Sequence, residues 1–212
     1  MTKELAIVGA SGHGKVIADM AEQLGFTVKF YDDAYPSITH IEHWSIHGTC
    51  ADLLALMNTD SLISHDAVVA IGNNETRQKI TQLLLHNRFN LITLVHPTAV
   101  VSQYAEVSQG VVVCAGAIIN PFAKIGIGCI INTSAVVEHD CRIHEFAHIC
   151  PNAAIAGGSI IGSSSWIGVG SQVKQLIQIG TNCMIGAGST VVKNIPDNAT
   201  AFGSPAVVKE SN

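Results

Sequence analysis

An aliphatic residue occupies every sixth position from Val101 to Val191, and this is the strongest constraint on the fold of the 212-residue sequence. Two residues before most of these positions stands a small residue, Ala, Ser or Cys. A fixed period of six is typical of a parallel β-helix, with the aliphatic residue pointing inward and the small residue filling a tight corner. The aliphatic positions are Val101, Val107, Val113, Ile119, Ile125, Ile131, Val137, Ile143, Ile149, Ile155, Ile161, Ile167, Val173, Ile179, Ile185 and Val191.

Three hexads make an 18-residue coil, so these sixteen hexads predict about five coils in a column about 25 Å tall. Residues 18 apart then stack, which places Gly157 above His139 and Gly158 above Asp140. A step without a side chain leaves room for a ligand beside His139 and gives access to backbone N–H groups, which suit a developing oxyanion. The alternative is that both glycines only serve a tight turn.

Three histidines fall close together in this repeat, His139, His144 and His148. None occupies an inward position, so we expect all three to face outward. Asp140 follows His139 directly, and a carboxylate beside an imidazole fixes its tautomer and favours it as a general base. Ordinary surface charge is the alternative reading. Zinc would need three ligands that converge on one point, and these histidines lie on different turn positions.

The first hundred residues have a different pattern. Strand, glycine turn, helix and strand follow one another, and the second strand ends in acidic residues, as in a nucleotide-binding βαβ unit. The glycines read G-x-x-G-x-G and the unit is half-sized, so a mononucleotide or nucleotide-sugar is expected rather than NAD. The expected elements are strands at 5–10, 27–31, 67–72 and 90–95, helices at 15–25 and 75–87, and a glycine turn at 9–14.

Three short segments lie at the carboxyl ends of the expected strands, where open α/β sheets bind ligands. They are Gly9–His13, Asp32–Asp33 and Gly72–Asn74. Plain turn chemistry explains any one of them, but less readily all three together. The sequence therefore predicts two domains, a nucleotide-binding domain at 1–96 and a β-helix at 97–212.

Composition excludes several other classes. The chain has 16 acidic and 11 basic residues without a basic stripe, so nucleic acid is not an expected partner. No apolar run is long enough to span a membrane, and the N-terminal segment lacks the pattern of a signal peptide. The six cysteines show no CxxC pairing. We expect a soluble, cytoplasmic protein with reduced thiols.

Segments of both halves resemble a known family. GASGHGKV, YDD, AIGNNETRQKI, INTSAVVEHDC and EFAHICPNAAIAGG are similar to segments of the bacterial nucleotide-sugar acetyltransferases that end in a left-handed β-helix. The likeness is greatest to the UDP-4-amino-sugar N-acetyltransferase of bacillosamine biosynthesis, and perosamine N-acetyltransferase and sialic acid O-acetyltransferase are similar too. The resemblance implies an α/β Rossmann-like half domain followed by a left-handed parallel β-helix of hexapeptide repeats.

The resemblance also implies a homotrimer, with acetyl-CoA as co-substrate between neighbouring β-helices and no metal. By motif match, His139 corresponds to the general base and Asp140 to its supporting acid, where the relative has a longer glutamate. The late FGSPA segment resembles a loop close to the CoA. Acetyl-CoA contacts correspond to His148, Gly157, Val169 and Ala187. The part that holds the nucleotide-sugar corresponds to Ser11, Gly12, His13, Asp32, Asp33 and Gly72.

The expected activity is acetylation of the C4 amine of a UDP-4-amino-4,6-dideoxy sugar by direct attack on the thioester. Other acceptors stay open, namely GDP- or dTDP-linked amino sugars and sialic acid, whose hydroxyl would be acetylated. Two further alternatives are a zinc enzyme similar to the γ-type carbonic anhydrases and a non-catalytic nucleotide-sugar-binding or scaffold protein. The sequence does not single out the nucleotide, the sugar or the pathway.

Overall fold

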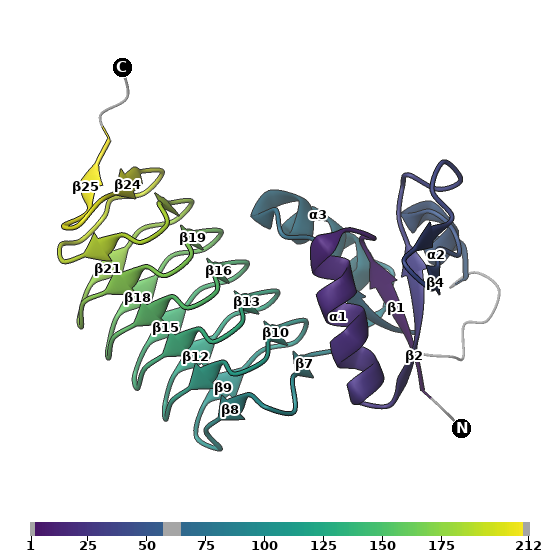
Figure 1. The fold of residues 1–212 in the computed structure, drawn as a ribbon, viewed down its shortest axis with the longest axis horizontal. Coiled ribbons are helices and arrows are strands. Elements are labelled where there is room, and N and C mark those ends of the chain that lie inside the picture. The colour runs from purple at the N-terminus through teal and green to yellow at the C-terminus, as the bar shows by residue number, and fades with distance from the viewer. Residues whose placement is uncertain (1–2, 57–64, 210–212) are drawn as a thin grey trace. The chain divides into compact units, whose positions relative to one another are not determined.

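The computed structural model describes residues 3–56 and 65–209, and the chain forms two compact units, Met1–Leu94 and Val95–Asn212 (Figure 1). The boundary lies beside the one expected between residues 96 and 97. Among the described residues, no helix combines the length and apolar character needed to span a membrane. The first unit contains β1 (Lys3–Val8), α1 (Gly12–Gln23), β2 (Phe26–Tyr31), β3 (His40–Ile41), β4 (Trp44–Ser45), α2 (Cys50–Leu56), β5 (Asp66–Val69), α3 (Asn74–His86) and β6 (Asn90–Leu91).

The sheet of the first unit is parallel, with strand order β2-β1-β5-β6. The chain passes from β1 to β2 on one side and then to β5 on the other, so the order reverses between β1 and β5. Leu5 and Ile7 of β1 are fully buried, while Val8 packs with Leu53 of α2 and Leu84 of α3 on the opposite face. In open α/β sheets such a reversal is where a ligand binds.

Two features of this unit differ from the sequence-based expectation. Helix α1 begins at Gly12 rather than Lys15, so most of the expected glycine turn forms the first turn of the helix. The hairpin β3–β4 and helix α2 were not predicted, because they are short and hold few apolar residues in a clear period. Strand β2 ends at Tyr31 as expected, whereas β5 ends at Val69, before the expected end at residue 72, and the expected strand at 90–95 forms two strands, β6 and β7 (Leu94–Val95).

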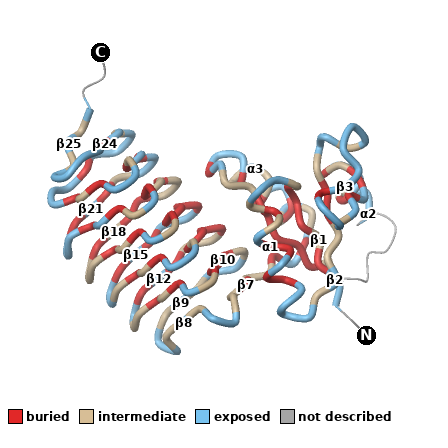
Figure 2. Tube along the Cα trace, viewed as in Figure 1, coloured by how far each residue is buried: buried red, intermediate tan, exposed pale blue. Residues whose placement is uncertain are grey.

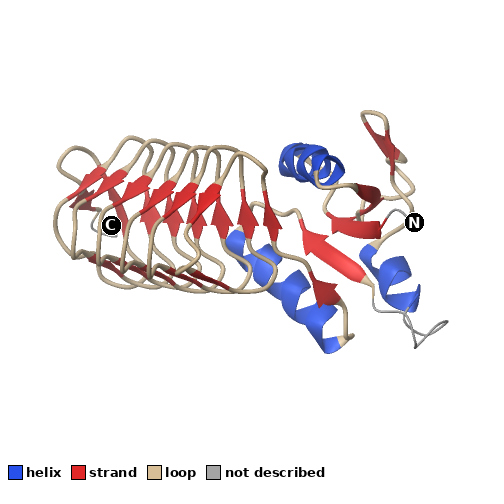
Figure 3. Cartoon of the chain, turned by 90° about the horizontal axis from the view of Figure 1, so that it is seen from below, coloured by secondary structure: helices blue, strands red, loops and turns tan. Residues whose placement is uncertain are grey.

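The second unit is a parallel β-helix with three faces (Figure 3). Through most of the column a strand pairs with the strand 18 residues away, for example Val136 with Ala154 in β14 and β17, whereas β22 pairs with β24 at a spacing of 16 residues, Met184 with Thr200. Face A contains β7 (Leu94–Val95), β10 (Val112–Val113), β13 (Ile130–Ile131), β16 (His148–Ile149), β19 (Trp166–Ile167), β22 (Met184–Ile185), β24 (Thr200–Phe202) and β25 (Val207–Val208). Face B contains β8 (Val100–Val101), β11 (Ile118–Ile119), β14 (Val136–Val137), β17 (Ala154–Ile155), β20 (Gln172–Val173) and β23 (Thr190–Val191). Face C contains β9 (Glu106–Val107), β12 (Lys124–Ile125), β15 (Arg142–Ile143), β18 (Ile160–Ile161) and β21 (Gln178–Ile179).

The predicted inward register is confirmed. The aliphatic hexad residues from Val113 to Val191 are buried, and so are the small residues two positions before them, as the alternation along each coil shows (Figure 2). Each fully buried aliphatic side chain contributes about 1.5–3 kcal/mol to folding. The column is longer than the expected five coils, because face A continues through β24, and β25 closes it as an antiparallel strand.

Candidate functional site

His139 and Asp140 form a turn at the corner between faces B and C, directly after β14. His139 Nδ1 lies 2.8 Å from Asp140 Oδ2. Because the carboxylate can only accept, Nδ1 carries the proton and Nε2 keeps its lone pair. Asp140 has a positive φ of 60°, a backbone conformation that Asp tolerates better than most residues. Both side chains are exposed, as the sequence predicted.

Gly157 and Gly158 lie above this pair but have different roles. A Cβ at Gly157 would lie 2.6 Å from His139 Nε2, so the imidazole itself fills the step that was expected to hold a ligand. Gly158 has a φ of +68°, which is the conformation that favours glycine in a tight turn. The turn reading therefore holds for Gly158, whereas the step at Gly157 is occupied by the His139 ring and does not leave the expected room for a ligand.

The two backbone N–H groups above His139 differ in their hydrogen bonding. The Gly158 N–H donates to the His139 carbonyl at 2.9 Å. Among the residues that the structure describes, the Gly157 N–H has no such acceptor. A base nitrogen and an available backbone donor therefore lie at the same corner, which is the pair of groups that acyl transfer needs.

His148 faces outward as expected, but its neighbours cover it. It occupies the outward register position on β16, yet only 4% of it is accessible. Its ring lies 4.3 Å from the Trp166 ring in the next coil, and its Nε2 lies 2.9 Å from Asn132 Nδ2 in the previous coil. Register alone gives the direction of a side chain but not how far its neighbours cover it. His144 is exposed as predicted.

Val169 and Ala187 lie on stacked turns at a different corner, between faces A and B, and both are exposed. The Gly188 N–H donates to the Val169 carbonyl at 2.8 Å, which fixes this stacking. Phe202, the first residue of the FGSPA segment, packs on Gly186 beside them, where a Cβ would lie 2.8 Å from Phe202 Cβ. A single chain thus places Val169 and Ala187 at one edge of the prism and His139 at another.

No metal site emerges from the histidines. Within residues 3–56 and 65–209, no three His, Cys, Asp or Glu side chains are grouped as ligands of one ion. Cys141 and Cys150 are buried, and burial raises the pKa of the Cys150 thiol to about 12. Burial also raises the pKa of Cys141. Neither thiol is a thiolate near neutral pH, so neither is a ready nucleophile or metal ligand.

In the first unit, the loop after β1 is built from close backbone contacts. A Cβ on Gly14 would lie 2.4 Å from the Gly9 carbonyl oxygen, and one on Gly9 would lie 3.0 Å from the Ala70 carbonyl oxygen. The start of α1 therefore packs against the ends of β1 and β5. Ser11 is the N-cap, but its side chain makes no capping hydrogen bond, and Gly12 faces open space. A helix N-terminus of this kind suits a phosphate.

The two predicted acidic residues hold the surrounding backbone. The Ala10 N–H donates to Asp32 Oδ2 at 2.7 Å, which ties the loop after β1 to the end of β2. The Cys50 N–H donates to Asp33 Oδ1 at 2.9 Å, at the start of α2. Each carboxylate retains lone pairs for a further donor, but part of its function is structural.

Arg77 on α3 was missed by the sequence analysis. Only 1% of it is accessible, and its guanidinium donates to the carbonyls of Ile71 and Gly72 and to Asn74 Oδ1. It thereby shapes the loop that contains the predicted Gly72. Burial and the Arg77 charge lower the pKa of His13 to about 4, so His13 is neutral near pH 7. A basic residue in the first turn of a helix opposes the helix dipole, and this signal could have revealed Arg77.

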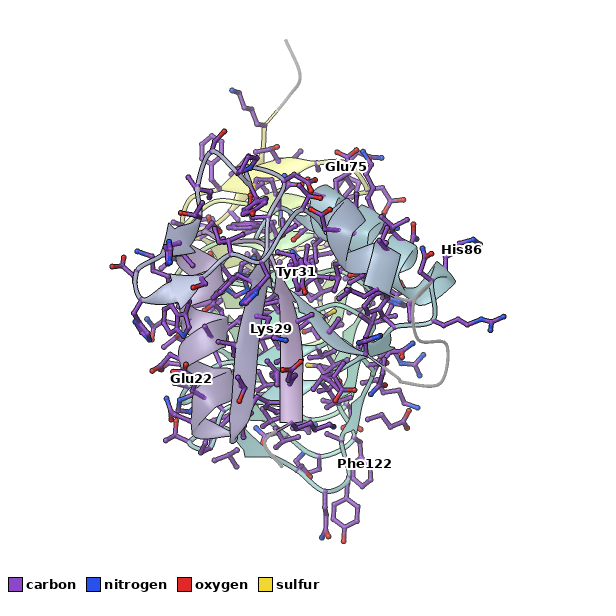
Figure 4. The ribbon with its side chains drawn as sticks, turned by 90° about the vertical axis from the view of Figure 1, so that its right-hand side faces the viewer. Glu22, Lys29, Tyr31, Glu75, His86 and Phe122 are labelled. Carbon is purple, nitrogen blue, oxygen red and sulfur yellow. The ribbon has the colours of Figure 1, made fainter. Side chains whose placement is uncertain are left out.

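An exposed aromatic pair lies one coil before the His139 turn and was also missed. Tyr104 and Phe122 stack with ring centroids 5.6 Å apart, and Phe122 is 60% exposed. Figure 4 shows the Phe122 ring projecting away from the coils. Phe122 precedes Asp140 by 18 residues. The 18-residue stacking that placed Gly157 above His139 would therefore have predicted that Phe122 lies next to Asp140 in the previous coil.

Comparison with known proteins gives matches to both units. Residues 4–84 match the family model described as the PglD N-terminal domain. The chain is 31% identical over 150 residues to GDP-perosamine N-acetyltransferase of Escherichia coli O157:H7, over 65% of each protein. It is 37% identical over 116 residues to UDP-N-acetylbacillosamine N-acetyltransferase of Bacillus subtilis (strain 168), over 53% of this chain and 52% of the relative. The matched stretches thus span less than two thirds of these two relatives.

A solved structure matches the whole chain. It is a histidine mutant of perosamine N-acetyltransferase from Caulobacter crescentus in complex with CoA and GDP-perosamine. The TM-score is 0.92 at 35% sequence identity, and the match covers 100% of this chain and 99% of that one. Both units therefore have their counterparts in a single solved chain.

Proposed function

The chain belongs to the hexapeptide-repeat family of nucleotide-amino-sugar N-acetyltransferases with a PglD-type N-terminal domain, and from this premise we propose that it acetylates the C4 amine of a nucleotide-linked 4-amino-4,6-dideoxy sugar. Acetyl-CoA is the donor. The observation that carries the proposal is the His139–Asp140 pair, whose hydrogen bond leaves Nε2 as the accepting nitrogen beside Gly157.

The first unit holds the nucleotide in this proposal. Ser11, Gly12 and His13 lie at the N-terminus of α1, where backbone N–H groups favour a diphosphate. The loop with Gly72 and the end of β2 with Asp32 and Asp33 complete the site at the carboxyl edge of the sheet. A neutral His13 can accept or donate without adding charge.

The reaction needs one base. The amine attacks the thioester carbonyl, and His139 Nε2 accepts its proton as the tetrahedral intermediate forms. The Gly157 N–H is the candidate donor to the oxyanion. Collapse breaks the C–S bond and expels the CoA thiolate, which takes a proton from the imidazolium. Asp140 keeps the proton on Nδ1 throughout and stabilises the charged ring.

Acetyl-CoA binds between two copies of the chain in this proposal. The outward residues of the first four strands of face B are aliphatic or small, Val100, Ile118, Val136 and Ala154, and Gln172 and Thr190 follow them, while those of face C include Glu106, Lys124 and Arg142. Burying face B rather than face C around a threefold axis is therefore favourable. In that trimer the A–B corner of one copy, with Val169 and Ala187, meets the B–C corner of the next, with His139. His148 contributes from face A.

A CoA-thiol release assay tests the proposal. The acceptors are UDP-, GDP- and dTDP-linked 4-amino-dideoxy sugars, free sialic acid and no acceptor. We expect turnover with nucleotide-linked amino sugars, and the preferred nucleotide names the substrate. Turnover with sialic acid alone would instead indicate O-acetylation, and the absence of CoA release with every acceptor of the panel would leave only a binding function.

The relatives differ in the nucleotide that their names give. One similar protein is named for a GDP-linked sugar and another for a UDP-linked sugar. We keep UDP as the first choice on the motif resemblance and GDP as the second on the full-length structural match. Competition by free UDP and GDP against the turning-over acceptor separates the two.

A further inference from the structure

Leu176 is a large apolar residue in an unfavourable place. It ends the turn after β20, where the backbone has a φ of +59°, a conformation that a bulky residue rarely adopts. It is also 74% exposed, more than any other large apolar side chain that the structure describes. Most left-handed turn positions of the β-helix hold a smaller residue that suits the conformation, namely Gly110, Gly116, Gly128, Ser134, Asp140, Asn152, Gly158, Ser164, Gly170, Asn182, Gly188 and Asn198. A leucine is therefore unfavourable here on two counts, its backbone conformation and its exposed apolar surface.

Two other large apolar residues of the β-helix have the same backbone conformation, Phe122 and Phe146. Phe146 is buried, and the ring of Phe122 stacks with that of Tyr104. Both rings therefore have packing partners within the chain. The side chain of Leu176 lies instead against Gly158, a residue without a side chain, at the corner that contains the proposed base.

His139 and Leu176 reach the same step of this corner from opposite sides. A Cβ on Gly157 would lie 2.6 Å from His139 Nε2. A Cβ on Gly158 would lie 2.8 Å from Leu176 Cδ2. The Leu176 N–H donates to the Gly157 carbonyl at 3.1 Å, which fixes the stacking of the upper turn. Because adjacent Cα atoms are about 3.8 Å apart, the apolar tip of Leu176 lies about one residue away from the base nitrogen.

The acceptor amine must lie beside His139 Nε2 to lose its proton. In a 4-amino-4,6-dideoxy sugar, the ring carbon next to the amine-bearing carbon carries a methyl group, whereas an ordinary 4-amino hexose carries CH₂OH there. We propose that Leu176 is a specificity-determining residue that packs on this methyl group and selects 6-deoxy acceptors, an inference that rests on the proposed function. The contact removes two apolar surfaces from water. A hydroxyl in the same place would lose hydrogen bonds to water and gain none from the leucine.

Steady-state CoA release with two acceptors that differ only at C6 tests the inference. One is the nucleotide-linked 4-amino-4,6-dideoxy sugar that turns over fastest in the acceptor panel, and the other is its analogue with CH₂OH in place of the methyl group. In the native protein we expect kcat/KM to be about 10- to 100-fold higher for the 6-deoxy acceptor. In Leu176→Asn, whose new side chain tolerates a positive φ, this ratio should fall to about 3 or less. The fall should come from a higher KM for the 6-deoxy acceptor, with an unchanged KM for acetyl-CoA. Leu176→Met keeps an apolar side chain and should keep the preference.

Phe122→Asn is the matched control. It also removes an exposed apolar side chain from a left-handed position at the same corner. Phe122 is one coil below Asp140, whereas the step that Leu176 covers is one coil above it, so the preference for the 6-deoxy acceptor should not change. An equal loss of preference in Phe122→Asn would assign the selection to the whole corner and overturn the role of Leu176.

The other outcomes are equally decisive. Equal kcat/KM for the two acceptors in the native protein, or an undiminished preference in Leu176→Asn, would overturn the inference. A higher KM for acetyl-CoA in Leu176→Asn would place the side chain against the donor instead. A smaller assembly of Leu176→Asn in light scattering would place it between copies of the chain, and either result would overturn the assignment to the acceptor. If no nucleotide-linked amino sugar of the panel turns over, the proposed function fails and this inference fails with it.

Discussion

The loop cluster of the first unit and the B–C corner of the β-helix both carry polar residues expected to bind or react, but they use them differently. In the loop cluster, Asp32 and Arg77 are engaged by backbone partners, and His13 is held neutral. At the corner, His139 and Asp140 are exposed and contact mainly each other. Substitutions of Asp32, Arg77 and His13 should therefore change stability and binding, whereas substitutions of the His139 and Asp140 side chains should change mainly the reaction.

The sharpest contrast is His139→Ala, for which we expect the largest effect. Losing a well-placed general base typically costs 10²- to 10⁴-fold in rate. Because the ring is exposed and outside the core, the midpoint of thermal unfolding should barely move. Steady-state kinetics and a melting curve on one preparation check the loss of rate and the unchanged midpoint of unfolding. Near-normal turnover in an intact assembly would remove His139 from the role of base.

Arg77→Met should have the opposite effect and lower the free energy of unfolding. The variant keeps much of the length of the side chain but leaves two carbonyls and the Asn74 oxygen without their buried donor. The Asn74 oxygen is buried, whereas the two carbonyls are partly buried. A buried acceptor left unsatisfied costs about 1–3 kcal/mol, so we expect stability to fall by about 1–3 kcal/mol. Denaturant unfolding measures it. The matched surface variant Arg88→Met should unfold like the native protein, and an equally stable Arg77→Met would contradict the structural role.

Substitutions of two adjacent glycines distinguish the effect of access to the His139 ring from the effect of the shape of the turn. Gly157→Ala places a methyl group 2.6 Å from His139 Nε2, and a misplaced base costs up to about 10²-fold in kcat. Gly158→Ala is strained by its φ of +68° and should cost about 1 kcal/mol in stability while the ring stays in place. Its new methyl meets only the flexible end of Leu176. Equal losses of kcat in both variants would mean that the shape of the turn matters rather than access to the ring.

The same contrast explains what the sequence could and could not predict. In the β-helix every residue repeats its neighbours' environment, so counting in steps of 6 and 18 placed the inward residues and set Gly157 over His139. The count gave the outward direction of His148 but not its burial, because burial there depends on the size of Trp166 and Asn132 rather than on register. In the first unit no period relates Arg77 to Gly72, or Asp33 to Cys50. Those contacts arise from tertiary packing, so only the strands, the helices and the expected ligand edge could be predicted.

His13 makes the stability of the first unit depend on pH. Its pKa is about 4 in the folded chain against 6.5 ordinarily, so the unfolded chain binds more protons between these values. The stability contributed by neutral His13 is complete above pH 6.5 and is lost as the pH falls toward 4. Between pH 7.5 and 5 the loss is about 2 kcal/mol. Denaturant unfolding at both pH values, with His13→Gln as the comparison, measures it. An equal drop in His13→Gln would assign the loss to other groups.

Cys150→Ala should have the smallest effect, although Cys150 lies in the same hexad run as His139 and His148. Its thiol is buried, with a pKa raised to about 12, so it cannot supply a thiolate to form an acyl-enzyme near neutral pH. Direct transfer needs no such group, and kcat should stay within about 2-fold, which is small beside the 10²- to 10⁴-fold effect of losing the base. Removing one buried sulfur leaves a small cavity that costs about 1 kcal/mol. A loss of kcat comparable with that of His139→Ala would show that the acetyl group passes through sulfur, and the exposed corner would then be only half of the reacting centre.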